Sequence, residues 1–332
     1  MSQACVFGEF ENLVGIYQAA SKSAVAPRLA VLILTPGMLH SAGPFRLHTA
    51  IADILSQAGI PSLRFDLSGI GESLAVGAVG SSLERAASEI QQAIDYLEKE
   101  HEITRVICFG LCSGADDAVF AALREPRIAG VYALDGCGFR TWKFHWHRLW
   151  VRYIPKLISL SKWWDKLTKT LGMNQQTPAS LQLGTDLREF PDRETAEDQL
   201  AQLVERGVHL HFHYTGGVDD YYNYPDQFTD MFPRLNARQA KGVTWNYQPQ
   251  SDHVGFLCEQ RNGIVDEVKS RVIAMSQFLA EEMGPQVASA SDAGEKSQPG
   301  SEPSEPSSAI CPVDYPAGVT SGTYGIRSTP LT

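Results

Sequence analysis

The segment from Val106 to Leu123 constrains the fold of this chain more than any other. A β-branched, apolar run leads into Gly110-Leu111-Cys112-Ser113-Gly114, and a helix-compatible stretch follows directly. Small residues two places before and two places after the central position let a strand turn sharply into a helix, so that the central side chain stands exposed on a strained backbone. The sequence therefore predicts a strand, a tight turn and a helix, with the Cys112 thiol at the turn.

A cysteine in this position has two interpretations. At the first turn of a helix, a thiol faces unpaired N–H groups and the positive end of the helix dipole, which favour the thiolate. The alternative is a buried, inert cysteine at the end of a core strand, which is what we expect of Cys108. Ser113 is a rival nucleophile, but it falls one place late in the Gly-x-nucleophile-x-Gly register, so we expect its backbone N–H to be used instead.

Length, charge and cysteine usage exclude several classes of protein. The 332 residues suffice for one large α/β domain with an insertion or for two domains. A net charge of −10 argues against nucleic-acid binding. No apolar run is long enough for a transmembrane segment and no signal-peptide pattern begins the chain, which predicts a cytoplasmic protein. The six scattered cysteines fit reduced thiols better than disulfides or a zinc site.

Along the chain, apolar runs alternate with amphipathic helical patterns. Two short β-like runs near Val6 and Leu13 predict an antiparallel lead-in. Further strands are expected at 29–34, 61–66, 106–111, 128–134, 208–214 and 243–247, and helices at about 43–58, 82–100, 116–123 and 263–283. This alternation predicts a mostly parallel sheet with right-handed crossovers.

The roughly seventy residues between the strand that ends at Leu134 and the next core strand are too many for a simple crossover. We therefore expect a helical cap insertion at 138–206, between a first core part at 1–137 and a second at 207–283. Within it, the segment 139–169 holds five of the six tryptophans and eight Lys or Arg against one acid. Such a cap suits an anionic membrane surface or an acidic, lipid-like substrate, whereas the favoured interpretation is that the tryptophans pack the cap onto the body. Residues 284–332 are rich in Ser, Pro and Gly and predict a disordered tail.

Alternating His209, His211 and His213 invite a metal interpretation. On one strand, however, side chains two residues apart are separated by about 7 Å, too far to ligate one ion without distortion. We expect neither a metal nor a cofactor.

Three residues that suit nucleophilic catalysis follow predicted strands. Cys112, Asp219 and His253 occur in the order nucleophile, acid, histidine, and each lies at the carboxyl end of a strand, where the loops of a parallel sheet gather into a site. His253 would act as base and then acid, and Asp219 would orient its imidazole, with Asp220 as an alternative. The backbone N–H groups of Ser113 and Met38 are the candidates for an oxyanion hole.

These motifs together resemble an α/β-hydrolase. They are the elbow at Cys112, the Pro36-Gly37…Gly43-Pro44-x-Arg46 loop, the Arg64-Phe65-Asp66-x-x-Gly69-x-Gly71-x-Ser73 turn, the Gly216-x-x-Asp219 turn and the Asp252-His253 pair. More narrowly, the chain is similar over about residues 5–283 to hydrolases associated with exosortase and exopolysaccharide gene clusters, often labelled serine aminopeptidase-like. The resemblance implies an eight-stranded, mostly parallel sheet with a helical cap and the triad above. Cysteine replaces the commoner serine, as in dienelactone hydrolases and polyester synthases.

Four further residues are candidates for substrate binding. His40 and Arg46 lie in the predicted oxyanion loop and suit a carboxylate or phosphate, although Arg46 equally suits a helix-start ion pair. Trp142 and Trp146 belong to the aromatic cap. Asp66 is expected to be structural.

The sequence favours an esterase or thioesterase that works through an acyl-cysteine intermediate on a small-molecule or lipid-like acyl substrate. An acyltransferase with the same triad is the close alternative, because a cap can shield the acyl-enzyme from water. A non-catalytic binding or scaffold protein of the same fold is the third hypothesis. Peripheral membrane contact through the cap is compatible with each.

Overall fold

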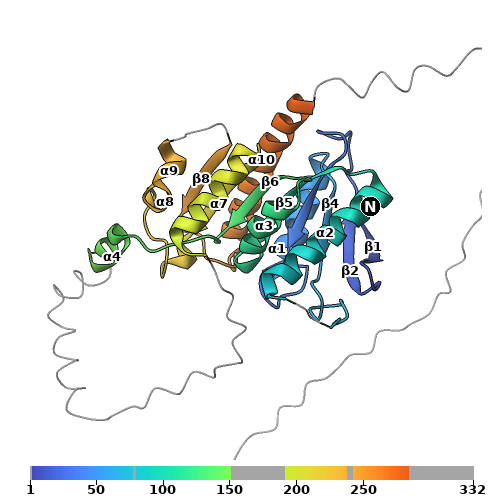
Figure 1. The fold of residues 1–332 in the computed structure, drawn as a ribbon, viewed down its shortest axis with the longest axis horizontal. Helices are drawn as coiled ribbons and strands as arrows, with labels where there is room; N and C mark the ends of the chain where they lie inside the picture. Colours follow the sequence, from blue (N-terminus) through green and yellow to red (C-terminus); the bar gives the residue numbers. More distant parts are fainter. Residues whose placement is uncertain (1, 78–79, 151–190, 238–241, 284–332) are drawn as a thin grey trace, which may run out of the picture. The chain divides into compact units, whose positions relative to one another are not determined.

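The computed structural model describes residues 2–77, 80–150, 191–237 and 242–283 (Figure 1). The predictions for most of the cap insertion, Trp163 and Trp164 included, and for the tail at 284–332 lie outside these residues.

A single eight-stranded sheet forms the centre of the fold. Its strands are β1 (Ser2–Phe7), β2 (Leu13–Gln18), β3 (Leu29–Leu34), β4 (Ser62–Phe65), β5 (Arg105–Leu111), β6 (Ile128–Leu134), β7 (His209–Thr215) and β8 (Val243–Gln248). Their order across the sheet is β1-β2-β4-β3-β5-β6-β7-β8. Strand β2 pairs antiparallel with both β1 and β4, and every other pair is parallel. The predicted mostly parallel, eight-stranded sheet with an antiparallel lead-in is confirmed.

Helices cover both faces of the sheet, which explains why its central strands are apolar throughout (Figure 1). One face packs against α1 (Leu47–Gln57) and α10 (Cys258–Met283). The other packs against α2 (Ser82–His101), α3 (Ser113–Arg124), α7 (Arg193–Glu205), α8 (Gln227–Met231) and α9 (Pro233–Ala237). Helix α10 begins at Cys258, earlier than the expected start near residue 263. Its first turn is polar, so the apolar periodicity in the sequence does not include it. Among the described helices, none combines the length and apolar character that crossing a membrane requires.

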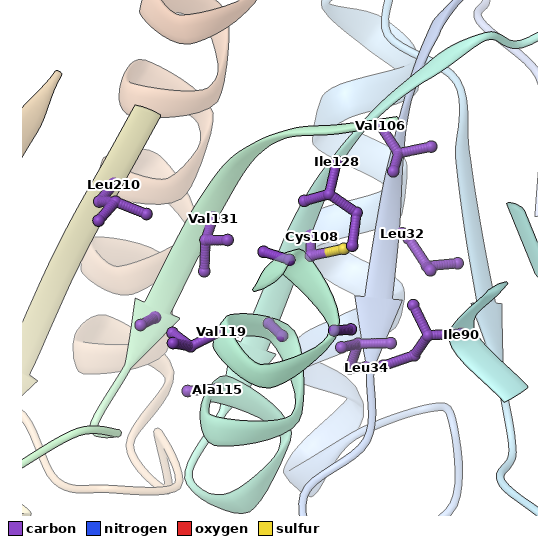
Figure 2. Close-up of a cluster of buried hydrophobic side chains, with 14 of the residues drawn as sticks. Leu32, Leu34, Ile90, Val106, Cys108, Ala115, Val119, Ile128, Val131 and Leu210 are labelled. Carbon is purple, nitrogen blue, oxygen red and sulfur yellow. The ribbon is translucent and has the colours of Figure 1, made fainter. Parts of the chain in front are cut away.

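The α2–α3 face holds a dense apolar cluster. Figure 2 shows Ile90 of α2 and Val119 of α3 against Leu32, Val131 and Leu210 of three parallel strands. Truncating such a buried aliphatic side chain to alanine typically costs about 2–5 kcal/mol. Cys108 lies fully buried in the same cluster, and burial raises the pKa of its thiol, so its expected structural role is confirmed.

Strand register fixes which loops meet at the carboxyl edge of the sheet. Leu111 of β5 pairs with Leu134 of β6, so the next residues, Cys112 and Asp135, leave neighbouring strands at the same level. Thr215 ends β7 on the other side of Asp135. The parallel sheet therefore delivers a thiol and a carboxylate side by side before any loop is considered.

Candidate active site

The turn at Cys112 has the strained geometry that its glycines predict. Cys112 has φ 54° and ψ −122°, an unfavourable combination for a residue with a side chain, which costs about 1–3 kcal/mol. Its N–H donates to the carbonyl of Leu134 (2.8 Å), which holds the turn in place. A side chain at Gly110 would collide with the backbone of Gly114, and one at Gly114 would crowd the Thr35 carbonyl. The predicted strand, tight turn and helix are confirmed.

His253, from the loop after β8, connects the Cys112 thiol to a buried carboxylate. Its Nδ1 lies 2.9 Å from Oδ2 of Asp135, whose side chain is fully buried. The hydrogen bond with Asp135, followed by one with the Cys112 thiol, raises the pKa of His253 to about 10 against the opposing effect of burial. The imidazole is therefore protonated at neutral pH and lies between an acid and a thiol.

Asp135 is fixed by the strand beside it. The backbone N–H of Thr215 donates to Asp135 Oδ1 (2.6 Å), and the Thr215 hydroxyl donates to Oδ2 (2.7 Å). The backbone carbonyl of Asp135 accepts a hydrogen bond from the Tyr221 hydroxyl (2.6 Å). Because both Asp135 and Thr215 are buried, these bonds hold the carboxylate in one orientation toward His253.

The carboxylate on His253 is thus neither Asp219 nor Asp220, the two acids expected from the sequence. After β7 the chain forms a tight 3-10 turn, η3 (Gly216–Val218), in which Gly217 packs against the backbone of His253. That turn carries Asp219 and Asp220 past the imidazole to exposed positions. Asp135 did have a signal in the sequence, since it ends a predicted core strand. Asp219, a later acid, also satisfies the order nucleophile, acid, histidine, so the order did not single out Asp135.

The loop after β3 is tied to the start of α3. Gly37, with φ 55°, donates its N–H to the Ser113 hydroxyl (2.6 Å), and Leu39 donates to the Pro36 carbonyl (3.1 Å). Between them, the Met38 N–H has no hydrogen-bond partner within the described part of the chain. The loop therefore leaves the Met38 N–H unpaired among the described residues, one residue after the Gly37 N–H that binds Ser113.

Asp66 is a structural anchor, as expected. Its buried carboxylate accepts hydrogen bonds from the N–H groups of Ser41 (2.5 Å) and Glu72 (3.2 Å), which joins the loop after β3 to the turn after β4. His40 is exposed, with Nε2 3.5 Å from Asp66 Oδ2. Arg46 is exposed and occupies the left-handed position before α1. Neither His40 nor Arg46 lines the cavity next to Cys112.

A cavity of about 510 Å³ opens beside Cys112 and Asp135. Most of its wall is hydrocarbon, contributed by α2, α3, α7 and the segment after β6: Leu83, Val119, Phe120, Phe139, Ala196 and Leu200. Asp116, Arg140, Gln199 and Tyr221 supply polar atoms. Both the size and the apolar lining suit a small organic ligand.

The tryptophans of the cap segment do not line this cavity. On helix α4 (Trp142–Arg148), Phe144 is the fully buried side chain, whereas Trp142 and Trp146 are 68% and 58% exposed. Trp150 is exposed as well. The expectation that tryptophans pack the cap onto the body is wrong for these three residues, because the helix turns Phe144 inward instead.

The histidines of β7 serve separate contacts. His211 Nδ1 lies 2.7 Å from the Thr244 hydroxyl, and His213 Nδ1 lies 2.7 Å from the Tyr132 hydroxyl. Burial lowers the pKa of both imidazoles, which keeps them neutral in the core.

Comparison with known proteins identifies structures with a similar fold. No protein-family model matches the sequence, and no curated protein matches it. The esterase PF2001 of Pyrococcus furiosus, in one crystal form, is 13% identical over 84% of this chain and 91% of its own, with a TM-score of 0.53. A second crystal form of that esterase is 13% identical over 84% and 92%, with a TM-score of 0.50.

A dienelactone hydrolase from Anabaena variabilis is 14% identical over 81% of this chain and 95% of its own, with a TM-score of 0.49. At these identities the likeness concerns the fold. The chain has the α/β-hydrolase fold, as the sequence motifs implied.

Proposed function

We propose that this chain cleaves an ester or thioester bond through an acyl-cysteine intermediate on Cys112. The observation that carries the proposal is the hydrogen-bonded series from Asp135 through His253 to Cys112 at the carboxyl edge of the sheet. A protonated imidazole beside the sulfur, together with the start of α3, stabilises a thiolate, which is the nucleophilic form of cysteine. Asp135 orients the imidazole and stabilises its cation.

In the first half-reaction, the Cys112 sulfur attacks the carbonyl carbon and forms a tetrahedral oxyanion. The N–H groups of Met38 and Ser113 stabilise that oxygen, and each such donor is worth roughly 100- to 1,000-fold in rate. As the intermediate collapses, His253 donates its Nε2 proton to the leaving alcohol or thiol. The acyl group is then held as a thioester on Cys112.

In the second half-reaction, the now neutral His253 takes a proton from water, and the hydroxide attacks the acyl-cysteine. Collapse of this second tetrahedral intermediate releases the carboxylic acid and returns the sulfur and the protonated imidazole to their starting states. An acceptor alcohol or amine in place of water would make the same chain an acyltransferase. The mostly hydrocarbon wall of the cavity favours the acyltransferase, because it offers water few hydrogen-bond partners.

The narrower part of the proposal, a hydrolase like those of exopolysaccharide gene clusters, rests on the sequence motifs. It directs the choice of acceptors in the test toward sugar hydroxyls.

The decisive experiment is intact-mass analysis after exposure to p-nitrophenyl and thioester acyl donors of several chain lengths. We expect wild type and Cys258→Ala, which removes an exposed cysteine, to gain one acyl group. Cys112→Ala should gain none, and His253→Ala should gain it much more slowly. Decay of the adduct in water identifies a hydrolase, and decay only with an added alcohol or amine identifies a transferase. If no protein gains mass while circular dichroism shows a native fold, the non-catalytic scaffold hypothesis replaces this one.

A further inference from the structure

We infer that the substrate of this site carries an anionic group and that Arg140, at the rim of the cavity beside Cys112, binds it. The inference rests on the proposed acyl-cysteine chemistry and adds the class of substrate. Among the described residues that line the cavity, Arg140 contributes the one permanently charged cation. It follows β6 closely, on the segment that begins with Asp135.

Two contacts with described residues hold the Arg140 guanidinium in place. Its Nε donates to the backbone carbonyl of Asp220 (2.8 Å), and its central carbon lies 5.9 Å from the centre of the Phe144 ring. The segment that carries it is packed tightly, because a side chain at Gly138 would collide with the Tyr221 ring. A cation anchored in this way loses little conformational entropy when an anion binds.

The two Nη groups of Arg140 have no carboxylate within ion-pair distance among the described residues. Arg127 and Arg234, in contrast, each have carboxylate partners: Arg127 pairs with Asp95, Glu98 and Glu125, and Arg234 pairs with Glu197 and Asp198. A planar guanidinium with a free Nη edge presents two parallel donors, the geometry that binds a carboxylate or a phosphate.

The acids that line the same cavity are already engaged. Asp135 accepts hydrogen bonds from His253 and Thr215. Asp116 accepts from the backbone N–H of Cys137 (2.9 Å). Neither is ion-paired with Arg140 within 4.0 Å, so the positive charge at the rim is left for a ligand.

The hydrocarbon wall and the cation at the rim together define an amphipathic acyl donor. Val119, Phe120 and Leu200 offer an apolar surface for its chain, and Arg140 offers a site for its charge. The anion has two possible sources, which share the same chemistry toward a guanidinium: a carboxylate at the far end of the acyl chain, or a phosphate in the leaving group.

Three thioesters of one acyl chain length separate these sources. The first is the neutral N-acetylcysteamine thioester of a monocarboxylic acid, the second is the coenzyme A thioester of that acid, and the third is the N-acetylcysteamine thioester of the dicarboxylic acid of equal length. The proteins are wild type, Arg140→Gln, Arg140→Lys and Lys143→Gln. Lys143 is a matched control, because it lies nearby, pairs with Asp230 and does not line the cavity.

We expect wild type to prefer one anionic donor, and Arg140→Gln to lower kcat/KM for that donor by roughly ten- to a hundredfold, the effect of losing a hydrogen bond to a charged group. The neutral donor should change less than about twofold, Arg140→Lys should recover part of the loss, and Lys143→Gln should have no effect. A loss confined to the coenzyme A thioester assigns the anion to the leaving group, and one confined to the dicarboxylic thioester assigns it to the acyl chain.

Equal losses for neutral and anionic donors in Arg140→Gln, or no preference for an anion in wild type, would overturn the inference. In both cases the neutral donor still acylates Cys112, so the proposed function stands. If no donor acylates Cys112, the proposed function fails and this inference fails with it.

Discussion

At the residue scale, the identity of the acid is the sharpest point to test. Asp135 accepts from Nδ1 of His253, whereas Asp219 is exposed. Asp135→Asn keeps the shape but removes the charge that orients and stabilises the imidazolium, so we expect kcat to fall about a hundredfold or more. Asp219→Asn is the matched control and should keep kcat within about twofold of wild type. Steady-state kinetics on both variants decides the assignment, and the reverse pattern would restore the acid that the motif order favours.

Thr215 is expected to be a positioning residue for that acid. Thr215→Val removes the hydroxyl that bonds Asp135 Oδ2 but leaves the backbone bond to Oδ1. A freer carboxylate supports the imidazolium less well, so the alkaline limb of the kcat/KM profile should shift to lower pH. Thr215→Ser, which keeps the hydroxyl, should restore the wild-type profile. A profile unchanged in Thr215→Val would limit Thr215 to packing.

Two of the three residues of this series were predictable from the sequence, and one was not. Cys112 and His253 are marked by local signals, a glycine-flanked turn and a polar loop after the last strand. The partner of His253 depends on which of several strand-end acids faces Nδ1. That choice is made by the register between β6 and β7 and by the turn at η3, which are tertiary properties.

At the element scale, we expect the same substitution to have opposite effects at a glycine in the elbow and at a glycine in α10. Gly110→Ala places a methyl group against the backbone of Gly114, which can yield only by moving α3. We expect a loss of about 2–4 kcal/mol in the free energy of unfolding, comparable with overpacking in a core. Gly263→Ala, in α10 with open space around it, should instead stabilise by about 0.5–1 kcal/mol. Urea denaturation measures both, and a neutral Gly110→Ala would mean that the turn is looser than described.

The elements themselves followed from periodicity where burial is unambiguous. Strands β3 and β6 are buried along their whole length and are continuous apolar runs in the sequence. Helix α4 shows where composition is a poor guide to burial. Tryptophans are the most prominent residues of this segment, yet Phe144 is the side chain that α4 buries, three residues after the N-cap Thr141.

At the scale of the whole molecule, the ion pair between His253 and Asp135 makes the stability of the fold depend on pH. The pKa of His253 rises from 6.5 to about 10 on folding, so the folded state binds the proton more tightly than the unfolded state. This contribution is fully present below about pH 6.5 and is lost as the pH rises toward 10. We therefore expect the free energy of unfolding to fall across this interval in wild type and to fall less in Asp135→Asn. Urea titrations at pH 6, 8 and 10 test the difference, and parallel curves for the two proteins would contradict it.

The position of Asp135 has a consequence for how this chain can diversify. Cys112 and Asp135 precede the long insertion that begins at residue 138, Arg140 lies near the start of that insertion, and Thr215 and His253 follow it. A change in this insertion therefore leaves the thiol beside its carboxylate, whereas it can alter Arg140 and the part of the cavity wall that Ala196 and Leu200 form. Substitution or grafting within this insertion can therefore change which substrates bind while Cys112, Asp135 and His253 stay the same.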